Sequence, residues 1–399
     1  MLGGGPGQLG VLETARALGV STAVCDRDPG APGFALADRR CLVSTEDEPA
    51  IERLAAALPA GGLIAPGSDR PVAAAARIAE KLGLAHPIAA ATALLATNRL
   101  KQREALEAAG VPQPRWQLVY SARDLELPTP LVVMPADRTG RSGLALVRRR
   151  SRLGAAVDAA RAASKTSSVL VEELVDGPEV TVSGFSAGGD FVALAVCGRL
   201  SAEVPAFGVA LAQLWPSPHA EAAAEVTRRA VEALGIAEGP TFTKLRVSRG
   251  GPEVVEVSAR VGGGYEAELV RLVTGLDLNA LAIASALGQP LGASDLRPPG
   301  GASVGGAATR FLLAPPGCLE SVEVPQGLHG VVATRLYRDP GHVFGPFRRA
   351  SDRAGAVLTA GATPEEALAR AELAAERIRF RMADAPHEAA VADARRSAS

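Results

Sequence analysis

The segment that constrains the fold most is residues 239–264, GPTFTKLRVSRGGPEVVEVSARVGGG. Its pattern predicts two strands joined by a tight turn. Alternate side chains of a strand share one face, so Glu256, Ser258 and Arg260 are predicted to point the same way beside the glycine run. Such a surface suits a metal-bound polyphosphate and an anionic substrate. The first strand, however, carries Lys244 where a second carboxylate would be needed to share a divalent metal.

The composition is that of an ordinary globular protein with two or three domains, since 47% of the 399 residues are hydrophobic and 21% are charged. A net charge of -1 and an aromatic content of 4% provide neither a field nor stacking groups for nucleic acid, and no field for an anionic membrane. No apolar stretch of membrane-spanning length and no signal peptide occur, so a cytoplasmic location is expected. Four scattered cysteines have no metal or disulfide pattern and are expected to be buried hydrophobes.

The N-terminal sequence GGGPGQLG matches the G-x-G-x-x-G pattern of dinucleotide-binding proteins at Gly5, Gly7 and Gly10, and an apolar strand ending at Asp26 follows. Only two residues precede these glycines, so the strand that should present them is missing or very short. The glycines therefore have a second interpretation as a plain strand-to-helix turn, and the true start of the protein could lie upstream.

Apolar periodicity predicts an N-terminal α/β domain with parallel strands, followed by hairpins and a mixed tail. Strands are expected at 63–65, 131–134, 144–147 and 169–175, and helices at 11–18, 71–82, 98–109, 220–234 and 364–379.

Several motifs occur in a specific order, namely GGGPGQLG, APGSDRPVAAAARIAEKLGL, NRLKQREALEAAGVPQP, PLVVMPADRTGRSGL, VLVEELVDGPEVTV and GHVFGPFRRASDRAGAVLTAGATPEEA. Together with residues 239–264, which contain Glu256, they resemble the ATP-grasp superfamily, in particular the carboxylate–amine ligases related to biotin carboxylase and the purine-pathway carboxylases. The resemblance implies an α/β and α+β multidomain fold, with nucleotide held between two antiparallel sheets. The expected parts are an α/β domain at 1–95, an ATP-grasp domain at 96–300 with a lid at about 115–175, a small domain at 301–385 and a frayed tail at 386–399.

In these enzymes ATP phosphorylates a carboxylate, and an amine displaces phosphate from the acyl phosphate to form an amide. The resemblance implies small-molecule carboxylate and amine substrates, ATP with at most one Mg²⁺, and a homodimer. It also implies four kinds of site residue. Catalytic roles fall to Lys244 and Arg260, the metal ligands are Glu256 and Ser258, and the substrate contacts are Gly262, Gly263 and Gly264. The nucleotide contacts are Arg99, Thr139, Gly140, Ser142, Gly143, Glu172, Val175 and Glu179. Within the nucleotide set, Glu172 and the backbone near Val175 resemble the adenine edge, and Glu179 resembles the ribose acceptor. A solvated strand end at Glu172 and Glu173 and an ordinary hairpin turn at the glycine-containing loop remain the structural alternatives.

Three positions depart from the family pattern. The family sequence V-V-K-P reads V-V-M-P here, and Met134, which cannot bind phosphate, is interpreted as a core residue. Lys244 stands where the family commonly has a metal-binding acid, and its charge would repel a cation by about 4 kcal/mol per unit of cation charge at an effective dielectric near 20. Ser258 replaces the usual Asn, whereas Arg99 replaces a family lysine with another cation.

Three hypotheses follow. The chain is an active ligase with Arg99 and Lys244 on the phosphates, Glu256 on Mg²⁺ and Arg260 on the acyl phosphate, working in specialised metabolism. Alternatively, it is a degenerate ATP-grasp protein that regulates a partner or runs a different reaction around Arg260. The third hypothesis is a nicotinamide-dependent oxidoreductase, which leaves residues 130–264 unexplained.

Overall fold

The computed structural model describes residues 1–137, 143–300 and 304–383. The chain divides into two compact units. The first comprises Met1–Cys197 and Ser217–Gly301, and the second comprises Gly198–Pro216 and Ala302–Ser399. The mixed α/β architecture with several sheets that the sequence predicts is confirmed.

The first unit begins with parallel pairing, as expected. Leu2 bridges Cys25, and the two short strands that follow pair in parallel. The elements are α1 (Leu9–Ala17), β1 (Ala23–Asp26), β2 (Arg39–Leu42), α2 (Glu48–Ala57), α3 (Arg70–Leu82) and α4 (Ala90–Thr97). The predicted strand at 63–65 is wrong, since pairing near this segment is limited to a bridge between Gly62 and Ala85 and a 2.9 Å hydrogen bond from the N–H of Leu2 to the carbonyl of Ile64.

Helix α5 (Arg99–Ala108) begins and ends where the sequence predicts. The side chain of Asn98 accepts a hydrogen bond from the backbone N–H of Lys101, which satisfies one of the free donors at the helix start. After the helix, Gly110 adopts a positive φ of 62°, which a glycine reaches without steric cost.

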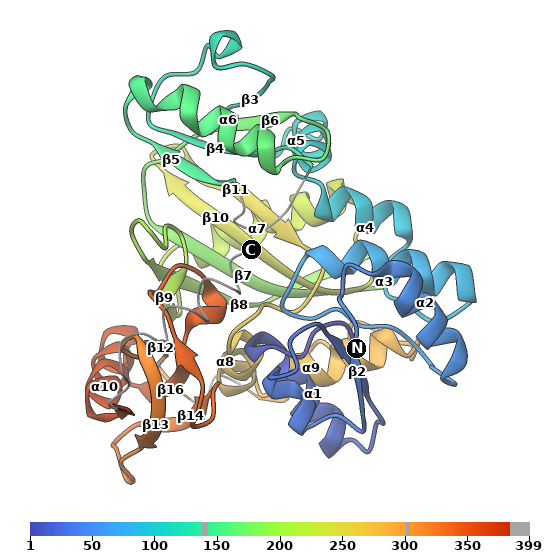
Figure 1. The fold of residues 1–399 in the computed structure, drawn as a ribbon, viewed down its shortest axis with the longest axis vertical. Helices are drawn as coiled ribbons and strands as arrows, with labels where there is room; N and C mark the ends of the chain where they lie inside the picture. The colour runs from blue at the N-terminus through green and yellow to red at the C-terminus, as the bar shows by residue number, and fades with distance from the viewer. Residues whose placement is uncertain (138–142, 301–303, 384–399) are drawn as a thin grey trace. The chain divides into compact units, whose positions relative to one another are not determined.

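A four-stranded antiparallel sheet in the order β3-β6-β4-β5 lies within the segment expected to be the lid. Its strands are β3 (Trp116–Val119), β4 (Leu131–Pro135), β5 (Ala145–Val147) and β6 (Val169–Glu173). Helix α6 (Leu153–Ala163) packs over one face of this sheet and buries an apolar layer against it (Figure 1).

A second group of antiparallel strands in the first unit has the order β11-β10-β7-β8, so that β11 is an edge strand. The elements are β7 (Glu179–Ala187), β8 (Asp190–Ser201), α7 (Ala220–Ala233), β10 (Gly239–Ser248), β11 (Gly251–Ser258), α8 (Glu266–Thr274) and α9 (Leu278–Ala286). The hairpin expected over 239–264 is confirmed, with Lys244 directly opposite Glu256 and a bulge between Lys244 and Leu245. Strand β11 ends at Ser258, however, so the alternation does not extend to Arg260 as predicted.

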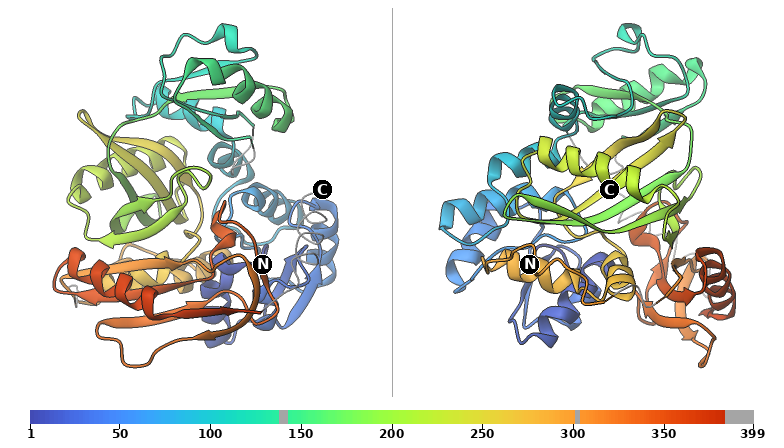
Figure 2. Two further views of the ribbon diagram at one scale, coloured as in Figure 1. Left: turned by 60° about the vertical axis from the view of Figure 1, so that its left-hand side comes forward. Right: turned by 180° about the vertical axis from the view of Figure 1, so that it is seen from behind.

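Strand β8 continues into the second unit, where the order is β8-β9-β12-β16-β14. The elements are β9 (Ala210–Trp215), β12 (Gly306–Leu312), β13 (Gly317–Glu323), β14 (Val331–Leu336), β15 (Val343–Phe344), β16 (Gly355–Gly361), α10 (Pro364–Arg377) and β17 (Arg379–Met382). Helix α10, which confirms the last predicted helix, packs beside β12 and β16 (Figure 2). No single helix in the described parts of the chain is long and apolar enough to cross a membrane, and only α8 and α9 taken together, bent by 114°, pass that test.

Candidate active site

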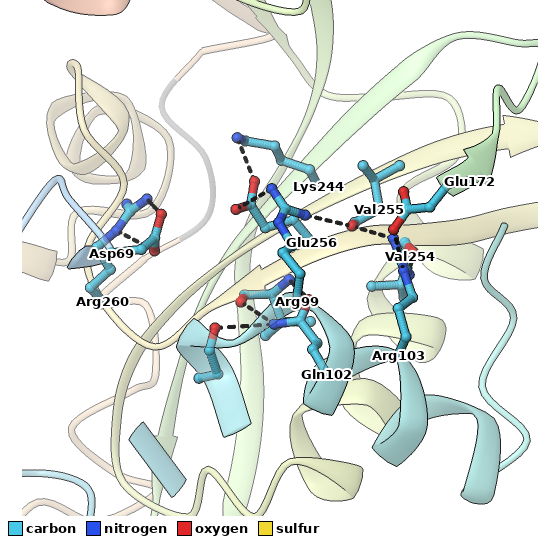
Figure 3. Close-up of polar contacts among 12 residues, drawn as sticks. Asp69, Arg99, Gln102, Arg103, Glu172, Lys244, Val254, Val255, Glu256 and Arg260 are labelled. Carbon is cyan, nitrogen blue, oxygen red and sulfur yellow. Dashed lines mark hydrogen bonds and ion pairs between the residues drawn. The ribbon is translucent and has the colours of Figure 1, made fainter. Parts of the chain in front are cut away.

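Glu256 on the edge strand β11 binds two cations, one on each carboxylate oxygen. Its Oε1 accepts a hydrogen bond from Nη2 of Arg99 at 2.8 Å, and its Oε2 accepts one from Nζ of Lys244 at 2.8 Å (Figure 3). The carboxylate is buried, whereas the Lys244 side chain is 31% exposed. Two positive charges on one carboxylate leave this cluster with one positive charge in excess.

The electrostatics of this cluster keep Glu256 ionised. Burial is the largest influence on the pKa of Glu256 and acts to raise it, but the charges of Arg99 and Lys244 outweigh burial and hold the pKa below its ordinary range. Burial likewise acts to lower the pKa of Arg99, and the nearby carboxylates, Glu256 first, raise it instead. Glu256 and Arg99 therefore stay charged at neutral pH.

Helix α5 places Arg99 by packing against the free edge of β11. Arg99, Gln102 and Arg103 are spaced three and four residues apart, which puts them on one face of the helix. Gln102 accepts from the N–H of Val257 and donates to its carbonyl, both at 2.9 Å. The carbonyl of Val255, next to the bulge, accepts from Arg99 at 3.2 Å and from Arg103 at 2.7 Å. The helix thus satisfies backbone groups that an uncovered edge would expose.

Glu172, on β6 of the four-stranded sheet, is bound to α5. Its carboxylate accepts a hydrogen bond at 2.7 Å from Arg103, whose side chain is only 1% exposed and also donates to the carbonyl of Val254 (Figure 3). The alternative of a solvated strand end is therefore wrong for Glu172. The neighbouring Glu173 does form a surface ion pair, with Arg115.

The two groups that the sequence suggests for adenosine, Val175 and Glu179, are bridged by one arginine. Arg246 donates from Nη1 to the carbonyl oxygen of Val175 at 3.0 Å and from Nη2 to Oε1 of Glu179 at 2.6 Å. Arg246 and Glu179 are directly opposite each other on β10 and β7.

Arg260 forms a separate pair with Asp69. Its Nε and Nη2 donate to the two oxygens of Asp69 at 2.8 and 2.9 Å (Figure 3). Its Nη1 donates to the carbonyl of Val261. Burial acts to lower the pKa of Arg260, but Asp69 outweighs it and the pKa is raised. The guanidinium is buried, and it connects the loop at Asp69 to the loop after β11.

Three glycine loops meet beside Arg260. A Cβ placed on Gly263 would lie 2.8 Å from the carbonyl oxygen of Gly67, and one on Gly67 would lie 2.9 Å from the carbonyl oxygen of Gly7. The N-terminal glycines therefore pack against the Gly262–Gly264 loop, where Gly264 has a positive φ of 120°. Asp26, the acid expected to hold a ribose in the dinucleotide interpretation, instead accepts a hydrogen bond from the N–H of Gly4. The oxidoreductase alternative gains no support from this arrangement.

The remaining predicted positions are less informative. Gly143 has a positive φ of 75°, and a Cβ there would lie 2.8 Å from Ala163 on α6, so the glycine is needed for packing. Thr139, Gly140 and Ser142 lie outside the described residues. The interpretation of Met134 as a core residue is confirmed, since it is buried in an apolar cluster.

The described residues do not fit a divalent cation at this site. No group of three or more His, Cys, Asp or Glu side chains gathers anywhere in residues 1–137, 143–300 and 304–383. Both oxygens of Glu256 already bind cations, and the Oγ of Ser258 is buried away from any hydrogen-bond partner within the described part. The geometry favours an anion instead.

Sequence reasoning missed four residues of this site. Gln102 and Arg103 share a helix face with Arg99, and Arg246 is two residues after Lys244 on the same strand, so local periodicity could have indicated these three. Asp69 had no such signal, because its partner Arg260 is 191 residues away.

Comparison with known proteins agrees with this architecture. Residues 310–383 match the family model of the L-amino acid ligase C-terminal domain 2. The structure of the L-amino acid ligase from Bacillus licheniformis superposes with a TM-score of 0.78 at 25% identity, over 96% of this chain and 98% of that one.

Two curated relatives match in sequence. The uncharacterized protein y4rH of Sinorhizobium fredii is 29% identical over 217 residues, which is 48% of this chain but only 42% of that protein's length. The formate-dependent phosphoribosylglycinamide formyltransferase of Burkholderia lata is 27% identical over 94% of both chains. With the two antiparallel sheets and the ordered motifs, these similarities support an ATP-grasp carboxylate–amine ligase.

Proposed function

We propose that this protein joins two amino acids through an amide bond at the expense of ATP. In the first step a carboxylate oxygen attacks the γ-phosphorus of ATP, so that an acyl phosphate forms and ADP leaves. In the second step the amine of the other amino acid attacks the acyl carbon, phosphate leaves, and the nitrogen gives up a proton. The amino-acid substrate class is supported by the L-amino acid ligases that this chain resembles.

The observation that carries the proposal is the excess positive charge at Glu256. Lys244 and Arg99 are held on one buried carboxylate, and the exposed part of Lys244 offers an ammonium to a phosphate oxygen. Fixed charges of this kind stabilise a transferring phosphoryl group without reorganising during the reaction. We assign to Lys244 and Arg99 part of the neutralisation that a metal ion supplies elsewhere.

The other site residues take supporting roles in this proposal. Val175 and Glu179 form the acceptors for adenosine, and the Gly262–Gly264 loop contacts the substrate. Arg260, fixed by Asp69, holds that loop and faces the acyl phosphate. A homodimer stays a prediction.

The test is an ADP-release screen of the purified protein with single L-amino acids and all pairs, with products identified by mass spectrometry. We expect release with at least one pair, and a fall of about 100-fold in Lys244→Met, because one preorganised donor is typically worth that much. Lys101→Met is the matched control, since Lys101 is exposed on α5. Full activity in Lys244→Met would contradict the role of the ammonium.

A second candidate function is supported by the unsuitable metal site and by Met134. In this case the protein keeps the fold but performs no phosphoryl transfer, and it regulates a partner or runs another reaction around Arg260. The same screen separates the two, because this candidate predicts no ADP release with any pair, with or without Mg²⁺. Lys244→Glu and Met134→Lys together would then restore Mg²⁺-dependent ATP binding.

A further inference from the structure

Arg246 is a charged group of this site that the proposed reaction does not use. It lies on β10 two residues after Lys244, and its side chain is 20% exposed. Both terminal nitrogens of its guanidinium are engaged, one on a backbone carbonyl and the other on a carboxylate.

The segment that Arg246 holds is fastened to β10 at further points. A Cβ on Gly177 would lie 1.9 Å from the carbonyl oxygen of Val247, so the turn contacts the strand backbone directly. The N–H of Val247 also donates to the carbonyl of Pro178 at 3.0 Å. Because these contacts hold the turn without Arg246, loss of the guanidinium should leave the backbone near Val175 in place.

The chemistry of a nucleoside makes the position of Arg246 significant. An adenine amino group donates to an acceptor such as a backbone carbonyl, and ribose hydroxyls donate well to a carboxylate. The carbonyl of Val175 and the carboxylate of Glu179 are such acceptors, and both already accept from Arg246.

We propose that Arg246 blocks the nucleoside end of the site, so that a nucleoside reaches Val175 and Glu179 only after the guanidinium has left them. This inference rests on the proposed function, since it concerns the same nucleotide. A site that is open for only part of the time binds with an affinity reduced by the open fraction. Arg246 therefore determines how tightly the base and ribose are held, whereas Lys244 and Arg99 act on the phosphates.

The experiment is calorimetric titration of the full-length protein with adenosine, with ATP and with inorganic tripolyphosphate. In Arg246→Leu we expect the affinity for adenosine and for ATP to rise about tenfold, and the affinity for tripolyphosphate to change less than twofold. Arg249→Leu, the same substitution at an exposed residue of the β10–β11 turn, should change none of them. Arg246→Lys keeps the charge but cannot bridge two acceptors, so it should also raise the affinity for adenosine if Arg246→Leu does not fold.

Equal or weaker adenosine binding in the folded Arg246 variants would overturn the proposal, because a residue that only positions the turn would weaken binding when removed. Absence of adenosine binding in every variant would overturn it as well. Failure of the proposed ligase function has a different signature, namely no ADP release with any amino-acid pair in either the unmodified protein or Arg246→Leu.

Discussion

At the scale of single residues, Lys244 changes what Glu256 can bind. A carboxylate alone attracts a cation, but a carboxylate that already binds an ammonium and a guanidinium has no charge left to offer. The pairing of Lys244 with Glu256 follows from the hairpin register, since the two residues are direct cross-strand neighbours. The register therefore places a cation, and not a second carboxylate, directly beside Glu256.

Lys244→Met should destabilise the protein and make it more sensitive to acid. Removing one of two cations should cost about 1–3 kcal/mol of unfolding free energy, because a buried charged acceptor loses a partner. The pKa of Glu256 is depressed in the folded protein, so its stabilising effect is present above the unfolded carboxyl pKa of roughly 4.3 and is lost as the pH falls below that value. With Lys244 removed the depression shrinks, and acid unfolding should begin at a higher pH.

Circular dichroism during acid titration measures this shift. Lys81→Met is the matched control, because Lys81 forms an exposed ion pair with Glu52 and surface pairs contribute little. An unchanged acid midpoint in Lys244→Met would show that Arg99 alone keeps Glu256 ionised.

At the scale of elements, α5 acts as the cover of the β11 edge. Its polar face supplies side-chain hydrogen bonds where a further strand would supply backbone ones, and Arg103 also reaches β6 through Glu172. The helix therefore connects the four-stranded sheet to the strand that carries Glu256. This connection requires a buried arginine, and each of the three guanidinium nitrogens of Arg103 finds an acceptor.

Arg103→Met should lower the free energy of unfolding by about 3–5 kcal/mol, because it leaves the buried carboxylate of Glu172 without its cation. Adding Glu172→Gln should recover part of the loss. Urea unfolding followed by fluorescence or circular dichroism measures both.

The adjacent pair provides the control. Arg115 and Glu173 have the same chemistry as Arg103 and Glu172, but Arg115 is 69% exposed, so Arg115→Met should leave urea unfolding unchanged. Similar losses in the two methionine variants would mean that burial does not set the strength of these pairs.

At the scale of the whole molecule, the first unit assembles its site from segments that are far apart in sequence. Gly7, in a short 3₁₀ helix, and Gly67 and Gly263, in two loops, come from three separate segments, and their backbones approach too closely to accept a side chain. The pair of Arg260 and Asp69 joins two of the same loops. The N-terminal glycines thus pack closely against the segments at Gly67 and Gly263.

Gly263→Ala should displace the Gly262–Gly264 loop, because its Cβ would lie 2.8 Å from the carbonyl oxygen of Gly67. The expected cost is about 1–3 kcal/mol, as for other overpacked sites. Thermal unfolding tests this value, and the ADP-release rate of the variant should fall as well. Gly250→Ala, in the exposed β10–β11 turn, is the control, because a Cβ there would lie 3.5 Å from its nearest neighbouring atom and should not change the stability. An unchanged stability in Gly263→Ala would show that the loops can separate freely.

Some features of this protein are determined by the sequence alone. Helix α5 is specified by the cap at Asn98 and the glycine at Gly110, and the hairpin register places Lys244 opposite Glu256 through a short turn. These features depend on residues close together in the chain, where periodicity and capping act directly.

Only the tertiary structure decided the partners of the arginines. In a chain with 42 basic residues and only four lysines, no local pattern shows that Arg260 binds Asp69, that Arg103 binds Glu172 or that Arg246 holds Val175. Each of these contacts joins segments at least 69 residues apart. The physical reason is that a charged side chain pairs with whichever carboxylate or carbonyl the packed backbone brings within hydrogen-bond distance, and that distance is set by the fold and not by sequence spacing.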